Sequence, residues 1–374
     1  MSFPHIIGNE ALICHAYNKD YTQMAVSINT PDIFILDVPQ RPNDKFVLKD
    51  SLKKHSLLVT SLDWSKNNDV LLSGSADREA YVWVKQNDGK WKATLTVLQN
   101  NRAVTSVLWS PLENKFAAGT GSKCVSISNY QAEFDIWSSK HLKKSIKSTV
   151  TCIDWHPNNV LIAVGSTDFR VRVFSAYLDK IDSNPEPNNW GSKLNFGSVL
   201  YETQPQKSGW IHDVKFSSDG NKLAFVSHNS TVSVIDASSN EINLITYKHD
   251  HLPFLSLVWV SNSTLLCAGH DCSPILYYYD SAQGKITQGI MLDQKSDSKS
   301  SGKLTAMQKF QNIDRMAATQ ENVGSKLTTI HQNSIRQILP MKNATKFSTI
   351  GLDGQLVIWD FDLLSKELTD LKIC

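Results

Sequence analysis

Residues 55–83 read HSLLVTSLDWSKNNDVLLSGSADREAYVW, and residues 331–359 read HQNSIRQILPMKNATKFSTIGLDGQLVIW. In both stretches a His is followed, after 18, 22 and 28 residues, by a Ser or Thr, an Asp and a Trp. A Ser, a His and an Asp suit a catalytic triad, but an enzyme rarely needs the same triad twice. We therefore predict two structural tetrads, in which an Asp in a tight turn accepts hydrogen bonds and the other side chains complete a buried chain. Their members are His55, Ser73, Asp77 and Trp83 in the first stretch and His331, Thr349, Asp353 and Trp359 in the second.

Seven segments of the chain share the rhythm of these two stretches. Each has three short apolar runs separated by turns with Asn, Asp, Gly or Pro, which is typical of strands and hairpins. Three successive segments begin at Val59, Val104 and Val150, a period of roughly 45 residues. Each segment would form one small β-sheet, a blade. A single blade cannot bury both its faces, whereas seven blades closed in a ring can, and closure leaves no open sheet edge. The pattern predicts an all-β, seven-bladed WD40 β-propeller over residues 1–374, with residues 3–7 supplying the outer strand of the last blade.

The tetrad pattern is incomplete in the other blades. His249 stands 22 residues before Asp271, so we interpret this pair as a tetrad His and Asp of the sixth blade rather than as part of a metal site with His270 and Cys272. Asp168 and Asn229 hold the same turn position in the fourth and fifth blades. Degenerate blades are common where ring closure supplies much of the stability.

Composition excludes several classes of protein. The chain has 374 residues, a formal net charge of +2 and six cysteines without a CxxC pair, which gives no argument for a nucleic-acid or membrane surface or for a zinc site. No signal peptide, membrane span, P-loop, GxGxxG or GxSxG motif is visible. The sequence predicts a cytoplasmic protein with no cofactor, no metal, no catalytic residues, no nucleic-acid partner and no membrane insertion.

One segment, residues 285–330, breaks the rhythm before the last blade. A polar run, QKSDSKSSGK, is followed by LTAMQKFQNIDRMA at 304–317. Leu304, Met307, Phe310 and Ile313 recur every three residues and predict a short amphipathic helix. The helix either packs back on the propeller or projects and inserts its apolar stripe into a partner, and the polar flank favours projection.

Two smaller features lie in blade connections. Residues 140–147, KHLKKSIK, form a basic run that is either a solvated face or a contact for an acidic partner. Residues 190–197, WGSKLNFG, place two aromatic side chains in a loop, where they either pin the loop or anchor a partner.

Several longer strings resemble one known family. They include NRAVTSVLWSPLENKFAAGTGS at 101–122, the stretch from KHLKKSIK to VLIAVGS at 140–166, AGHDCSPIL at 268–276, and FQNID with HQNSI downstream. These strings are similar to the WD-repeat subunit (subunit 1) of the actin-related protein 2/3 complex, and the likeness covers nearly the whole chain.

This resemblance implies a non-catalytic scaffold. The family's complex binds the side of an actin filament and nucleates a branch, and its propeller subunit contacts actin-related protein 2 and subunits 4 and 5. The propeller also lies beside a binding site for the acidic tails of nucleation-promoting factors, for which we select Lys140, Lys143 and Lys144. The resemblance further implies that the inserted helix reaches the mother actin filament and that the protein belongs to the actin cytoskeleton. The filament contact would be made by Leu304, Met307, Phe310, Gln311, Ile313 and Asp314.

Two other functions compete with the scaffold. A WD40 adaptor that recruits substrates to a modifying enzyme would need a peptide groove, to which Arg78, Arg102 and Arg170 could contribute. A propeller enzyme would need reactive polar residues converging on the central channel, and the sequence shows none beyond the tetrads. The inserted helix distinguishes the scaffold from the adaptor, since only the scaffold needs it.

Overall fold

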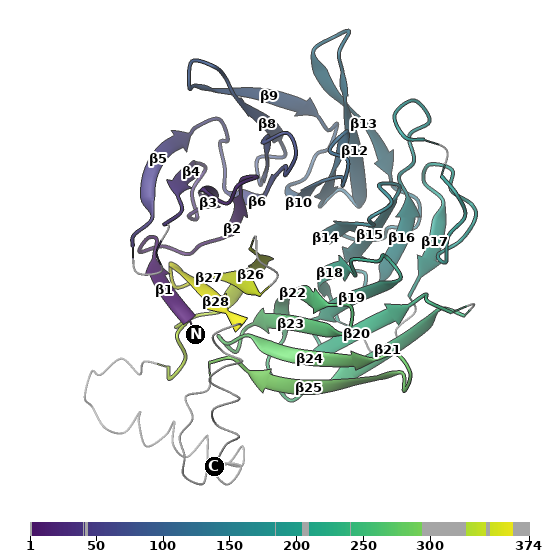
Figure 1. The fold of residues 1–374 in the computed structure, drawn as a ribbon. Coiled ribbons are helices and arrows are strands. Elements are labelled where there is room, and N and C mark those ends of the chain that lie inside the picture. The colour runs from purple at the N-terminus through teal and green to yellow at the C-terminus, as the bar shows by residue number, and fades with distance from the viewer. Residues whose placement is uncertain are drawn as a thin grey trace.

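The strands form a closed ring of seven blades around a central channel (Figure 1). The computed structural model describes residues 2–39, 41, 44–183, 185–203, 209–239, 241–293, 327–341 and 345–361. Within these residues each blade has four antiparallel strands. In blades 1 to 6 the first strand in the sequence lies next to the channel, and in blade 7 this place is taken by β26. The predicted all-β, seven-bladed propeller is confirmed.

The first four blades follow the chain without a break. Blade 1 comprises β2 (Cys14–Tyr17), β3 (Gln23–Ser27), β4 (Ile33–Asp37) and β5 (Val47–Leu52). Blade 2 comprises β6 (Val59–Trp64), β7 (Leu71–Ser75), β8 (Ala80–Lys85) and β9 (Trp91–Val97). Blade 3 comprises β10 (Val104–Trp109), β11 (Lys115–Thr120), β12 (Cys124–Gln131) and β13 (Ile136–Leu142). Blade 4 comprises β14 (Val150–Trp155), β15 (Leu161–Ser166), β16 (Val171–Ser175) and β17 (Val199–Glu202).

The last three blades complete the ring. Blade 5 comprises β18 (Ile211–Phe216), β19 (Lys222–Ser227), β20 (Thr231–Asp236) and β21 (Asn243–Lys248). Blade 6 comprises β22 (Phe254–Ser261), β23 (Thr264–Gly269), β24 (Ile275–Asp280) and β25 (Lys285–Met291). Blade 7 comprises β26 (Ile335–Pro340), β27 (Lys346–Gly351), β28 (Gln355–Asp360) and β1 (Ser2–Ile6).

Strand β1 joins the two ends of the chain. It pairs antiparallel with β28, from Ser2 opposite Trp359 to Ile6 opposite Gln355. The prediction that the N-terminal segment supplies the outer strand of the last blade is confirmed, with bounds one residue earlier than expected. This pairing covers the edge of β28 and closes the ring, since an open edge would leave backbone groups without partners.

Each blade packs both faces against its neighbours, which explains the continuous apolar runs. In β15 every side chain from Leu161 to Ser166 is buried. Glycines in the second strands allow the blades to approach closely. A Cβ at Gly74 would lie 2.6 Å from Val104 Cγ1 of blade 3, and a Cβ at Gly119 would lie 2.8 Å from Val150 Cγ1 of blade 4.

Blades 2 and 3 are also joined at their outer strands. β9 and β13 pair in parallel for two residues, Thr96 with Trp137 and Val97 with Ser138, so the two blades form one eight-stranded sheet. A groove lies beside this short pairing, lined by residues of both blades that include Trp137.

The inserted segment begins with regular blade structure. Its first part, Lys285–Met291, is β25, the outer strand of blade 6. The helix predicted at 304–317 lies outside the described residues. Among the described residues no helix is both long and apolar enough to cross a membrane.

Candidate functional site

The structure joins the members of each tetrad by hydrogen bonds. His55 Nδ1 lies 2.8 Å from Asp77 Oδ2, His55 Nε2 lies 2.8 Å from Ser73 Oγ, and Trp83 Nε1 donates to Ser73 Oγ at 2.9 Å. The second tetrad has the same connections. His331 Nδ1 lies 3.2 Å from each Asp353 oxygen, His331 Nε2 lies 2.8 Å from Thr349 Oγ1, and Trp359 Nε1 donates to Thr349 Oγ1 at 2.9 Å.

The aspartates also hold their turns together. Asp77 accepts backbone N–H groups of Ser56 at 2.9 Å and Glu79 at 3.0 Å. Burial alone would raise the pKa of Asp77, but these bonds and His55 outweigh burial, and the pKa is lowered. Ser73 is fully buried, and its hydroxyl bonds both His55 and Trp83. The tetrad therefore ties the turn that holds Asp77 to the strands of the blade.

Blade 6 departs from the predicted tetrad. His249 Nδ1 accepts the backbone N–H of His251 at 3.2 Å, and the His249 ring lies against Phe254 with centroids 4.4 Å apart. Asp271 instead lies 3.5 Å from His251 Nδ1 and accepts the backbone N–H of Leu252 at 2.8 Å. The interpretation of His249 and Asp271 as a tetrad pair is therefore wrong. The histidine two residues later takes the place beside the carboxylate, because His249 turns into an apolar cluster.

Blade 4 uses an arginine that the sequence analysis missed. Arg172 is fully buried, its Nη2 lies 2.9 Å from Asp168 Oδ2, and Asp168 also accepts the backbone N–H of Lys147 at 3.0 Å. The signal was present in the sequence as an arginine inside the apolar strand VRVFS, since a charged side chain in a buried strand needs a partner. In blade 5, Asn229 Oδ1 accepts the hydroxyls of Ser227 at 2.6 Å and Thr231 at 2.9 Å.

A second repeated feature lines the channel. In six blades the first strand has a β-bulge directly after its first residue, which re-aims one side chain. The bulged residue is the second residue of the strand. In blades 2, 3 and 4 it is a threonine whose hydroxyl donates to a backbone carbonyl of the next blade. Thr60 bonds Val104 O at 2.7 Å, Thr105 bonds Val150 O at 2.7 Å, and Thr151 bonds Ile211 O at 2.6 Å. In blades 5, 6 and 7 the position holds His212, Leu255 and Arg336.

Carboxylates along the channel also connect neighbouring blades. Asp63 accepts the backbone N–H of Trp109 at 2.7 Å. Asp154 accepts Lys215 Nζ at 3.1 Å, and Asp213 accepts Ser256 Oγ at 3.1 Å. Burial raises the pKa of Asp63 to about 6, although the Trp109 N–H and nearby lysines act against it.

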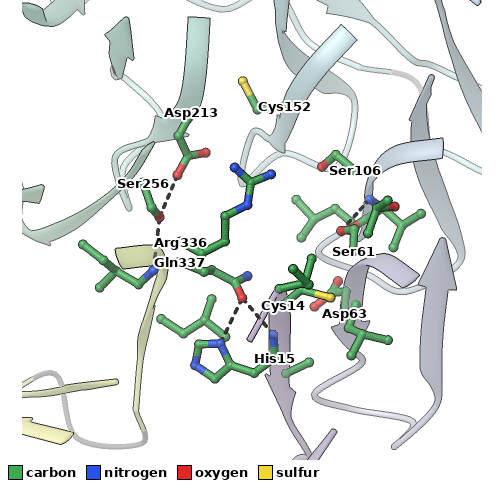
Figure 2. A pocket seen from close by; sticks show the side chains of 18 of the residues that line it. Cys14, His15, Ser61, Asp63, Ser106, Cys152, Asp213, Ser256, Arg336 and Gln337 are labelled. Atoms are coloured by element: carbon green, nitrogen blue, oxygen red, sulfur yellow. Dashed lines mark hydrogen bonds between the residues drawn. The ribbon is translucent and has the colours of Figure 1, made fainter. Parts of the chain in front are cut away.

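Asp63, Asp213, Lys215 and the bulged residues line a cavity of about 260 Å³ inside the ring, and Asp154 is not part of this lining. Figure 2 shows Arg336 reaching into it among residues from several blades, with Cys14 and Cys152 at its wall. Burial raises the pKa of both thiols, so they stay protonated and are poor nucleophiles. His15 bonds Gln337 Oε1 at 2.9 Å and Ser348 Oγ at 2.8 Å, which ties blade 1 to blade 7. The polar groups of the cavity wall thus mainly hold blades together.

The predicted contact residues fall in two places. Lys140 is exposed on β13, with Nζ 5.8 Å from the centre of the Phe196 ring, and Lys143 and Lys144 are exposed in the turn that follows. The residues selected for the filament contact, Leu304, Met307, Phe310, Gln311, Ile313 and Asp314, lie outside the described residues.

Other sequence alternatives are decided by burial and geometry. Trp190 is 3% exposed and donates from Nε1 to Gly220 O at 2.8 Å, so it pins its loop to the propeller. Across the part of the chain that the structure describes, no three His, Cys, Asp or Glu side chains are grouped to hold a metal ion.

The blades, their tetrads and their closure define a WD-repeat β-propeller. The family model "WD domain, G-beta repeat" matches residues 46–84 and 139–175. Actin-related protein 2/3 complex subunit 1A-A of Xenopus laevis is 46% identical over 369 residues, covering 97% of this chain and 98% of the relative. The subunit 1 proteins of Schizosaccharomyces pombe and Saccharomyces cerevisiae are 36% and 33% identical, and each alignment covers 92% of this chain and 95% and 93% of the relative. The chain belongs to the family of actin-related protein 2/3 complex subunit 1.

Proposed function

We propose that this chain is a non-catalytic scaffold subunit of an actin-related protein 2/3 complex and supports actin filament nucleation and branching. The similarity to the Xenopus laevis subunit, 46% identity along 97% of the chain, carries this proposal. The hydrogen bonds inside the ring support it, because His15, Asp63 and Asp154 each bond a residue of a neighbouring blade. As a member of that complex the chain would work in the cytoplasm, at the actin cytoskeleton.

The partners of this scaffold would be actin-related protein 2, subunits 4 and 5 and the mother filament. The basic residues Lys140, Lys143 and Lys144 are exposed at the outer side of blade 3 and would meet the acidic tail of a nucleation-promoting factor. Charge reversal of the three lysines should weaken binding of an acidic peptide, and the loss should shrink at high salt because the contact is between exposed charges.

Affinity purification of the tagged chain at moderate salt tests the complex itself. We expect stoichiometric companions that include two actin-like proteins. Recovery of a kinase, a ligase or another modifying enzyme without actin-like proteins would instead show that the propeller is an adaptor.

The filament contact has a separate test in the double variant Met307→Asp, Phe310→Ala. A projecting stripe predicts an unchanged melting temperature and fewer branches on existing filaments, because the changed side chains would face the filament. A large drop in melting temperature would show that the stripe packs on the propeller instead.

A further inference from the structure

An open groove separates blades 2 and 3 on their outer side. Its volume is about 420 Å³, and its wall on blade 2 includes Val82 and Val84 of β8. The wall on blade 3 includes Tyr130, Trp137 and the ring of Trp109 at the end of β10. Trp109 and Trp137 have ring centroids 5.5 Å apart, and Tyr130 and Trp137 5.6 Å apart. The groove is therefore a preformed aromatic and aliphatic site on rigid strands.

The apolar side chains at its mouth are exposed to solvent. Val84 is 42% exposed and Tyr130 is 46% exposed. Phe134 does not line the groove but precedes the lining residue Asp135 in the turn between β12 and β13, and it is 69% exposed. Exposed aromatic and aliphatic side chains that continue a concave apolar site are typical of a surface that binds another protein.

The same propeller shows what fills a wedge of this kind. Between blades 4 and 5, Trp190 packs with its ring centroid 5.6 Å from Phe216 and 6.0 Å from Tyr201. Phe216 ends the first strand of blade 5 as Trp109 ends the first strand of blade 3, and Tyr201 belongs to the outer strand of blade 4. A loop of this chain thus supplies a large aromatic side chain to that wedge, while the wedge at Trp109 stays open.

The charges at the rim restrict the occupant further. Lys92 on the blade 2 wall lies 3.6 Å from Asp135 on the blade 3 wall, and Tyr130 Oη donates to Asp135 Oδ1 at 2.6 Å. Glu113, the other charged residue of the lining, accepts the backbone N–H groups of Lys66, Asn67 and Asn68. Because each charge of the lining already has a partner, a strongly acidic or strongly basic segment gains little here. An uncharged apolar anchor complements the groove best.

We propose that the groove between blades 2 and 3 binds a companion subunit, which inserts a large apolar or aromatic side chain beside Trp109 and Tyr130. This inference rests on the proposed function, since it takes the companion from the same complex. Trp190 in the wedge between blades 4 and 5 models the inserted side chain.

Three variants of the tagged full chain test the groove. Val84→Glu places a charge in it, Val84→Trp fills it, and Val47→Glu is the control, since Val47 is 60% exposed in the outer strand β5 of blade 1. After purification from cells, we expect both Val84 variants to recover at least tenfold less of the actin-like companions than wild type. Val47→Glu should recover the wild-type amount. Val84→Trp adds apolar volume without a charge, so it keeps the test valid if Val84→Glu fails to fold.

The possible results distinguish a failure of the proposed groove contact from a failure of the proposed scaffold function. If a folded Val84→Trp variant recovers the wild-type amount of actin-like companions, the groove does not bind a companion subunit, while the scaffold function stands. Absence of actin-like companions from the wild-type sample would overturn the scaffold function and the groove's companion with it. Two differently tagged copies of the chain that copurify only with Val84 intact would show a second copy in the groove, which overturns the companion.

Discussion

At the scale of single residues, the buried Asp353 is held by several hydrogen bonds that its removal would break. Asp353 accepts hydrogen bonds from Nδ1 of the His331 ring and from the backbone N–H groups of Gln332 at 2.7 Å and Gln355 at 3.1 Å. Burial would raise the pKa of Asp353, but His331 and the two N–H groups outweigh it and the pKa is lowered. The carboxylate is thus one node of a network rather than a reactive group.

Asp353→Ala should lower the free energy of unfolding by about 1–3 kcal/mol, because it leaves a His nitrogen and two backbone donors unpaired. Urea unfolding measures the change. The exposed Asp20 is a suitable control, and Asp20→Ala should leave the midpoint where it is. An unchanged midpoint for Asp353→Ala, together with loss of branching activity, would contradict the structural role of the tetrad.

His15 predicts a pH dependence of stability. Burial lowers the pKa of His15 to about 4, below the ordinary value of about 6.5. Between these values the unfolded state binds a proton that the folded state excludes, so stability present above pH 6.5 is lost as the pH falls toward 4. The slope for one such group is about 1.4 kcal/mol per pH unit. Asp63 acts in the opposite direction below pH 6, because its pKa is raised in the folded state.

Comparison of His15→Asn with wild type isolates this group. Urea unfolding at pH 7, 6, 5 and 4.5 should show a smaller acid loss for the variant, although its stability at pH 7 is lower. Parallel pH profiles for the two proteins would show that His15 takes up its proton as easily in the folded state as in the unfolded one.

At the scale of elements, the outer strand of blade 7 comes from the other end of the chain. β1 covers β28 through pairs from Ser2–Trp359 to Ile6–Gln355. Ring closure therefore depends on a five-residue strand whose removal would open an edge.

A chain that begins at residue 7 should melt at a temperature lower by about 5 °C and should aggregate faster, because the exposed edge of β28 can pair with other chains. Differential scanning calorimetry and light scattering measure the two effects. Restoring the segment as a separate peptide should reverse part of the loss. Equal melting temperatures would mean that packing between blades closes the ring without β1.

The sequence spacing between His and Asp predicted the tetrads of blades 2 and 7 correctly but failed in blade 6. The His55 and His331 tetrads were predictable because each lies within one blade, where strand length fixes the spacing. His249 has the same spacing, yet its ring packs on Phe254 and His251 approaches Asp271. Spacing counts residues along the chain but does not say which of two nearby histidines will lie beside the carboxylate and which will pack on an aromatic ring.

For the whole molecule, charged side chains connect neighbouring blades around the channel. Lys215 of blade 5 bonds Asp154 of blade 4, and Asp213 beside it bonds Ser256 of blade 6. Burial would lower the pKa of Lys215, but Asp154 and Asp213 outweigh it and the pKa is raised. One lysine therefore compensates two carboxylates in a poorly solvated channel.

Lys215→Met should destabilise the propeller by about 3 kcal/mol, since it leaves two carboxylates without their cation. Lys92→Met is the control, because Lys92 is 52% exposed and pairs with an exposed Asp135, and a surface pair contributes little. Thermal and urea unfolding of both variants give the comparison. Equal stabilities of the two variants would contradict a structural role for the channel charges.

The sequence by itself determined the propeller, the number of blades, the strand that closes the ring and the tetrads of blades 2 and 7. All of these follow from periodicities and spacings that lie within single repeats, or from the need to cover a sheet edge. The tertiary structure alone decided the partner of Asp271, the burial of Trp190, the bulged residues that face the channel and the groove beside Trp109. The burial of Trp190 and the groove depend on side chains from different blades, which are distant in sequence, and no local pattern records how closely two blades approach. The partner of Asp271 and the bulged residues depend on side-chain packing and strand register within a blade, which residue spacing does not fix.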